Sequence, residues 1–191
     1  VSDAEPLATG DDKLPGLLRK DFVRDQLDFT HLAGRAVDRN LLAWKGPSVH
    51  TVVVTLRCNF KGLYCHARVV GVDRRDKDMS GDTARKVVDL IFQSPSPSLM
   101  IEFQGGEPLL NWPVVKFITR YAREKNKLAK RTLHFGLISN FSLLDDEKIE
   151  FLIENGVSFC TSLDGPKDLH DQNRVYLGGN SHESVLAGIR K

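Results

Sequence analysis

The chain repeats one order of segments four times: a short, mostly β-branched run expected to be a strand, then an amphipathic run expected to be a helix. The predicted strands cover residues 49–56, 99–103, 133–138 and 157–163. Strands that alternate with helices form a parallel sheet, because each helix returns the chain to the same end of the sheet. The pattern predicts an α/β fold and fits either an open doubly wound sheet or a barrel. The first strand is almost wholly apolar and is expected to be buried on both faces.

Each predicted helix carries its own boundary signals. Ser80 is a suitable amino-terminal cap, and the residues after it place apolar side chains at helical spacing. Pro113 begins the second helix, and Asp145 caps the third, which ends at Asn155-Gly156. Ser181 opens a fourth helix at the end of the chain. These signals support the strand–helix repeat independently of the apolar pattern.

The segment before the repeat is weakly periodic. Only short helices are predicted there, around residues 17–27 and 30–43. The chain begins at Val1 and stops within a predicted helix, so we expect a piece of a longer protein. The expected organisation is an amino-terminal segment over 1–48 and a core domain over 49–191 that is incomplete at its carboxyl end.

Composition narrows the functional classes. With 41% hydrophobic and 27% charged residues, the 191-residue chain has the composition of a soluble globular domain. The net charge of +2 gives no reason to expect a nucleic-acid or membrane partner. We expect no signal peptide, because the first residues are polar and acidic, and no apolar run approaches the roughly 20 residues that span a bilayer. Three cysteines, an odd number, argue against a disulfide framework, and a cytoplasmic location is expected.

The unusual residues of the chain follow the predicted strands in turn. In an open sheet and in a barrel alike, binding and catalysis gather at the carboxyl ends of parallel strands. The residues in question are Cys58, Gly62 and Cys65 after the first strand, Gly105, Gly106, Glu107 and Pro108 after the second, Ser139 and Asn140 after the third, and Ser162 and Asp164 after the fourth.

The first of these loops is Cys58-Asn-Phe-Lys-Gly62-Leu-Tyr-Cys65. A cysteine at position 62 would complete C-x-x-x-C-x-x-C, a spacing that lets three thiolates bind three irons of a [4Fe–4S] cluster. Thiolates are soft ligands suited to such clusters. With glycine in the middle, two ordinary thiols are the plainer interpretation of the cysteines taken alone. Tyr64 offers an aromatic face beside them, and His66 is either a further ligand or an exposed loop residue.

The remaining loops each allow a functional and a plain interpretation. Two glycines at 105 and 106 would let the backbone approach a ligand, with Glu107 placed to bind an ammonium group, or they form a tight turn. Ser162 and Asp164 lie two apart on one face of the fourth predicted strand, or Asp164 belongs to an ordinary turn. Cys160 is expected deeper on that face, as a small core residue. Arg174 holds a carboxylate or forms a surface salt bridge.

Taken together, these motifs resemble the radical S-adenosylmethionine (SAM) superfamily. The run Ser162-Leu-Asp-Gly-Pro166 with His170-Asp-Gln-Asn-Arg174 resembles the peptide-modifying maturases that include the anaerobic sulfatase maturases. Three stretches, 46–58, 92–98 and 101–110, are similar to the His-Xaa-Ser system radical SAM maturase. The resemblance covers about residues 40–191.

The resemblance implies a partial TIM-like barrel with parallel strands, truncated after about four strand–helix units. Cys58 and Cys65 would bind iron of a [4Fe–4S] cluster, whose open iron would chelate SAM. Glu107 would take the ammonium of SAM with the neighbouring glycine backbone, and Arg174 would pair with the methionine carboxylate. Tyr64 would lie near the adenine. The implied cofactor-binding residues are Tyr64, Gly105, Gly106, Glu107, Pro108, Ser139, Asn140, Ser162, Asp164 and Arg174.

The implied activity is reductive cleavage of SAM to a 5′-deoxyadenosyl radical that takes a hydrogen from a peptide or small protein. The implied partners are that substrate and a second maturase, with no nucleic acid and no membrane. No catalytic residue is assigned beyond the cofactor site. Because Gly62 replaces a cluster ligand, weak or absent catalysis is expected. The rival interpretation is a non-catalytic barrel scaffold that binds a peptide or partner protein, and a third is a single-base change from a cysteine codon.

Overall fold

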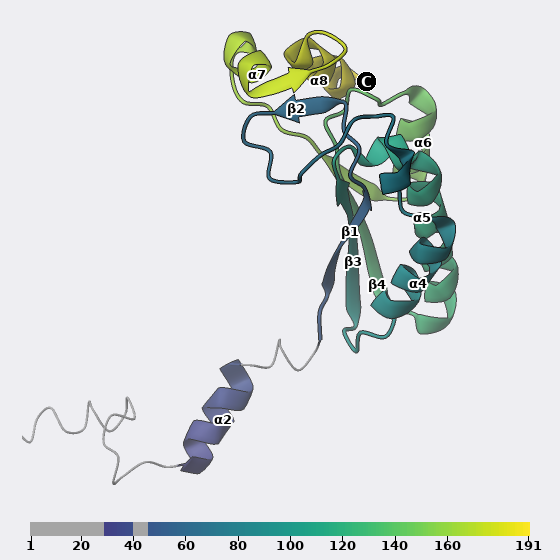
Figure 1. Ribbon diagram of the computed structural model, residues 1–191. Helices are drawn as coiled ribbons and strands as arrows, with labels where there is room; N and C mark the ends of the chain where they lie inside the picture. Colours follow the sequence, from purple (N-terminus) through teal and green to yellow (C-terminus); the bar gives the residue numbers. More distant parts are fainter. Residues whose placement is uncertain (1–28, 40–45) are drawn as a thin grey trace, which may run out of the picture. The chain divides into compact units, whose positions relative to one another are not determined.

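The computed structural model describes residues 29–39 and 46–191 (Figure 1). The chain divides into two units, Val1–Trp44 and Lys45–Lys191. The first unit contributes one described element, helix α2 (Phe29–Arg39).

Helix α2 begins one residue before the helix that the sequence predicts over residues 30–43 and overlaps it. The last four residues of that range lie outside the described residues, as does the whole predicted helix over 17–27.

The second unit is built on a four-stranded parallel sheet with the strand order β1-β3-β4-β5. Its strands are β1 (Val49–Thr55), β3 (Ser98–Gly105), β4 (Thr132–Ile138) and β5 (Val157–Cys160). Every neighbouring pair is parallel. The predicted α/β fold with parallel strands is confirmed, and the sheet does not close into a barrel within the described residues.

Helices α4 (Gly81–Ile91), α5 (Trp112–Ala129) and α6 (Asp146–Glu154) lie along one face of the sheet (Figure 1). The Ser80 hydroxyl accepts a hydrogen bond from the Thr83 amide at 3.2 Å, and the Asp145 carboxylate accepts one from the Lys148 amide at 2.9 Å. Each bond satisfies an amide that the first helical turn leaves without a partner, which is why these helices begin where the sequence predicts.

The hydrophobic core lies between this sheet face and these helices. Alternate residues of the strands point into it, and the apolar stripes of the helices cover them. Burial of this apolar surface is the main stabilising contribution to the fold. Its fully buried members include Val54, Leu99, Ile101, Phe103, Val88, Val115, Ile118 and Leu152.

The opposite face of the sheet is open. Val49 is 61% exposed and Val53 46% exposed, and Cys160 is an exposed free thiol. The prediction that the first strand is buried on both faces is therefore wrong, and so is the prediction that Cys160 is a core residue. The physical reason is the same for both, because α4, α5 and α6 cover only the other face.

A second layer of short elements lies beyond the carboxyl ends of the parallel strands (Figure 1). Strands β2 (Phe60–Gly62) and β6 (Arg174–Tyr176) pair in antiparallel fashion. Helices α7 (Lys167–Asn173) and α8 (Ser181–Arg190) complete the layer. Cys58, Phe60 and Val185 form a small apolar cluster there. This layer places the cysteine loop above the sheet.

Two 3₁₀ turns, η2 (Arg75–Lys77) and η3 (Pro108–Asn111), complete the second unit. Among the described helices, none is both long enough and apolar enough to span a lipid bilayer.

Candidate functional site

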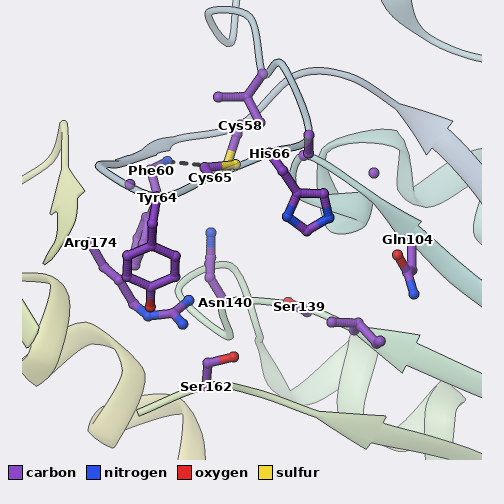
Figure 2. Close-up of a pocket in the computed structure, with 16 residues that line it drawn as sticks. Cys58, Phe60, Tyr64, Cys65, His66, Gln104, Ser139, Asn140, Ser162 and Arg174 are labelled. Atoms are coloured by element: carbon purple, nitrogen blue, oxygen red, sulfur yellow. Dashed lines mark hydrogen bonds between the residues drawn. The ribbon is translucent and has the colours of Figure 1, made fainter. Parts of the chain in front are cut away.

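A pocket of about 290 Å³ opens where the predicted loops meet, at the carboxyl ends of the parallel strands (Figure 2). The predicted residues that line it are Cys58, Gly62, Tyr64, Cys65, Gly105, Gly106, Ser139, Asn140, Ser162 and Arg174. Loops that follow all four parallel strands thus contribute to one cavity. The pocket joins polar groups with apolar walls, as small-molecule sites commonly do.

The two cysteines of the loop after β1 share this pocket, and both are free thiols. Cys58 is buried and its sulfur accepts a hydrogen bond from the Phe60 amide at 3.3 Å, whereas Cys65 is exposed. Burial raises the pKa of the Cys58 thiol to about 11. Cys58 is therefore a neutral thiol near pH 7 in this structure.

Gly62 lies in β2, opposite Arg174 of β6. A Cβ atom added there would lie 3.5 Å from the Asn173 carbonyl oxygen and 3.7 Å from the Cβ of Cys65. These are ordinary van der Waals distances. The local structure does not require glycine at this position, and a cysteine side chain could begin there without steric conflict.

The two glycines at the end of β3 allow close contact with the backbone at the end of β1. A Cβ on Gly105 would lie 2.2 Å from the Thr55 carbonyl oxygen, and one on Gly106 would lie 2.3 Å from the Arg57 carbonyl oxygen. The Gly106 amide donates to the Thr55 oxygen at 3.0 Å. Only glycine allows the end of β3 to lie this close to the end of β1.

Glu107 is fully buried, and the residues lining the pocket do not include it. One carboxylate oxygen accepts from the Leu109 amide at 3.0 Å and the Ser139 hydroxyl at 2.9 Å. The other accepts from the Asn140 amide at 2.7 Å. Burial raises the pKa of Glu107 to about 7, against the lowering effect of these three bonds. Pro108, which begins η3, is also buried outside the pocket lining.

Asn140 links the pocket floor to the cysteine loop. Its side-chain amide donates to the Asn59 side-chain oxygen at 2.9 Å. The side-chain amide nitrogen of Asn59 in turn donates to the Ser142 hydroxyl at 2.7 Å. The residue next to Cys58 is therefore fixed to the loop that follows β4.

Three residues far apart in the sequence meet at the pocket rim. The Tyr64 hydroxyl donates to one Asp164 oxygen at 2.5 Å, and the Arg174 Nε donates to the other at 2.8 Å. The Arg174 guanidinium also lies over the Tyr64 ring, 5.3 Å from its centre. Burial alone would raise the pKa of Asp164, but the bonds from Tyr64 and Arg174 outweigh it and lower that pKa.

The expected placement of Ser162 and Asp164 on the fourth strand is wrong, because β5 ends at Cys160. Both residues lie in the loop that follows, where Gly165 adopts a φ of +90°. Ser162 lines the pocket, whereas Asp164 is held at the rim by its two partners. The backbone bends at Gly165 and Pro166, just after Asp164.

Comparison with known proteins decides the family. The model of the radical SAM superfamily matches residues 52–191. The chain belongs to the radical SAM superfamily. An uncharacterized protein of Methanocaldococcus jannaschii is 29% identical over 126 residues, which are 66% of this chain and 41% of that protein. A cysteine-type anaerobic sulfatase-maturating enzyme of Clostridium perfringens is 29% identical over 122 residues, which are 61% of this chain and 32% of the enzyme.

Solved structures agree with this family at the level of the fold. Native anSMEcpe with bound AdoMet superimposes with a TM-score of 0.65 at 24% identity, over 74% of this chain and 39% of that one. This radical SAM chain therefore spans less than half the length of these relatives.

This radical SAM chain offers two cysteine thiols in the pocket, whereas the cluster that the family implies needs three thiolate ligands. Within residues 29–39 and 46–191, no three or more His, Cys, Asp and Glu side chains are grouped so that they could hold a metal ion. The pocket supplies the thiols of Cys58 and Cys65, with Gly62 between them in the sequence. A [4Fe–4S] cluster bound through three protein thiolates does not fit these residues.

Five pocket residues were not predicted from the sequence: Phe60, Ala67 and Val69, which follow β1, and Gln104 and Ile138. The last two occupy the final part of a parallel strand on the open sheet face, where Gln104 donates to Glu102 at 2.5 Å. Gln104 follows Met100 and Glu102 at a spacing of two residues. That alternation was a usable signal, because residues two apart on a strand share a face.

Proposed function

We propose that the chain is part of a radical SAM peptide maturase of the His-Xaa-Ser type and that its pocket binds SAM. The observation that carries the proposal is the single cavity shared by loops after all four parallel strands. The relatives support it, since they include anaerobic sulfatase-maturating enzymes, and one solved neighbour holds both AdoMet and a Cp18Cys peptide. The peptide substrate and the second maturase remain parts of the proposal.

The pocket residues suit the parts of SAM. The Arg174 guanidinium carries a permanent positive charge in a planar fork, which matches the methionine carboxylate. The ring of Tyr64 offers a flat face for the adenine. The hydroxyls of Ser139 and Ser162 and the amide of Asn140 are neutral hydrogen-bonding groups, which suit the ribose.

The test is calorimetric titration of SAM into the anaerobically purified chain. Arg174→Gln should weaken binding at least tenfold, because it removes a charge-assisted bond to the carboxylate. Arg75→Gln, at an exposed arginine of η2, is the matched control and should bind like wild type. Absence of SAM binding to wild type, or equal losses in both variants, would contradict the proposed pocket.

Gly62 favours a second candidate function, a scaffold that binds a peptide or partner protein without cleaving SAM. The missing thiolate is the specific observation behind it, since two thiols cannot supply three iron sites. In this case the chain keeps the nucleotide pocket and lacks the cluster that would deliver an electron to SAM.

Anaerobic reconstitution with iron and sulfide separates the two candidates. Gly62→Cys should bind about four iron and four sulfide per chain, the composition of a [4Fe–4S] cluster, whereas wild type should bind far less. Gly62→Ser matches the size of the new side chain without its thiolate and should resemble wild type. A full cluster in the wild-type chain would exclude the scaffold.

A further inference from the structure

The segment Gly105–Glu107 joins three strand ends. The Glu107 amide donates to the Arg57 carbonyl oxygen at 2.7 Å, just after β1, while its carboxylate binds the loop after β4. We propose that Glu107 is a positioning residue, whose carboxylate clamps the loops after β3 and β4 and so shapes the SAM pocket without touching the ligand. This inference rests on the proposed SAM site and assigns Glu107 a different role from the ammonium contact that the family resemblance implies.

The hydrogen bonds of Glu107 leave little capacity for a ligand. Both oxygens are occupied, one by the Leu109 amide and the Ser139 hydroxyl, the other by the Asn140 amide. The side chain has no exposed surface. One acceptor position remains, on the oxygen that the Asn140 amide binds, and because the side chain is fully buried an ammonium group could reach it only if the loops above it moved apart.

The clamp acts on the groups that form the pocket. Ser139 and Asn140, its partners after β4, both line the cavity, as do the two glycines that precede Glu107. Asn140 also donates a hydrogen bond to Asn59, beside Cys58, so the clamp extends to the cysteine loop. Hydrogen bonds that fix a site before the ligand binds reduce the conformational entropy that is lost on binding, and so increase the affinity.

The ionised carboxylate is the form that fits this role, and it predominates above pH 7, near the pKa of Glu107. All three groups around it donate hydrogen bonds, and an ionised carboxylate only accepts. In Glu107→Gln, the side-chain amide nitrogen would face either the Asn140 N–H or the pair formed by Leu109 N–H and the Ser139 hydroxyl. One side of the clamp would therefore be lost, even though the side chain keeps its size.

The test compares two ligands of the wild-type chain and of Glu107→Gln by calorimetry. SAM carries the ammonium and carboxylate, and 5′-methylthioadenosine lacks both. A clamp predicts that Glu107→Gln weakens both ligands by the same factor, at least tenfold. Glu147→Gln is the matched control and should change neither, because this α6 carboxylate accepts its hydrogen bond from Lys116 of α5.

The outcomes separate the clamp from its rivals. A loss for SAM alone would identify Glu107 as a direct ammonium ligand and overturn the inference. A lower melting temperature with unchanged dissociation constants, measured on folded protein, would show a structural role only and also overturn it. If wild type binds neither ligand, the proposed SAM site itself fails.

A second measurement needs no variant. Amide hydrogen exchange in the wild-type chain should show that the Leu109 and Asn140 amides stay equally protected, or become more protected, when SAM saturates the pocket. A fall of tenfold or more in the protection of either amide upon SAM binding would mean that Glu107 releases it to meet the ligand, and the clamp would be refuted.

Discussion

At the scale of single residues, the raised pKa of Glu107 makes stability depend on pH. Its value of about 7 in the folded chain exceeds the ordinary 4.5, so the unfolded chain releases this proton first. The stabilising contribution is complete below pH 4.5 and is lost as pH rises through 7. Cys58 stays neutral over this range, because its pKa is about 11.

Urea unfolding of wild type and Glu107→Gln at several pH values measures this dependence. The stability of wild type minus that of the variant should decrease steadily from pH 5 to pH 8, since other groups titrate alike in both proteins. A difference that stays flat, or that grows as pH rises, would show that Glu107 titrates at its ordinary pKa.

The same residue shows what the sequence could predict here and what it could not. The glycines and Glu107 were recognised as special from their position after a strand. Their contacts could not be predicted from the sequence. Glycine is required because any larger residue would clash with the carbonyl oxygens of Thr55 and Arg57, about 50 positions earlier in the chain. Which groups surround a carboxylate depends on tertiary structure that periodicity does not encode. The predicted ligand contacts of these residues stay predictions.

At the scale of elements, the turn after β1 depends on an ion pair between a buried arginine and a partly buried aspartate. The Arg57 guanidinium donates to both Asp78 oxygens, at 2.8 and 2.6 Å, and to the carbonyl oxygens of Val72 and Leu110. Asp78→Asn should destabilise the chain by about 3 kcal/mol, because a buried guanidinium would lose its counter-charge.

Asp76→Asn is the matched control for that substitution. Asp76 also pairs with an arginine, Arg74, at 2.8 Å, but both side chains are exposed. An exposed pair contributes little, so the unfolding midpoint should stay near that of wild type. Equal shifts of the unfolding midpoint in the two variants would show that the Arg57–Asp78 pair stabilises the fold no more than the exposed pair does.

The main elements were predictable because each combined a periodic apolar pattern with a capping residue. Ser80 and Asp145 begin their helices as expected. Strands β2 and β6 were missed, since an alternating pattern cannot be recognised in three residues. The fourth strand was extended too far, because β-branched Thr161 and apolar Leu163 continue the strand-like composition beyond Cys160, where β5 ends.

At the scale of the whole molecule, the parallel sheet explains why one cavity collects residues from such distant positions. Parallel strands end at the same edge, so the loops after β1, β3, β4 and β5 meet there. This convergence followed from the sequence pattern alone. The exposure of the second sheet face could not be predicted in the same way, because a strand–helix repeat pattern does not reveal which face the helices leave open.

The most direct test of the account is a crystal structure of this chain grown with SAM. We predict electron density for the ligand in the pocket between the cysteine loop and Ser162, with its carboxylate on Arg174 and no contact to Glu107. SAM bound elsewhere on the chain, or held by the Glu107 carboxylate, would contradict the account.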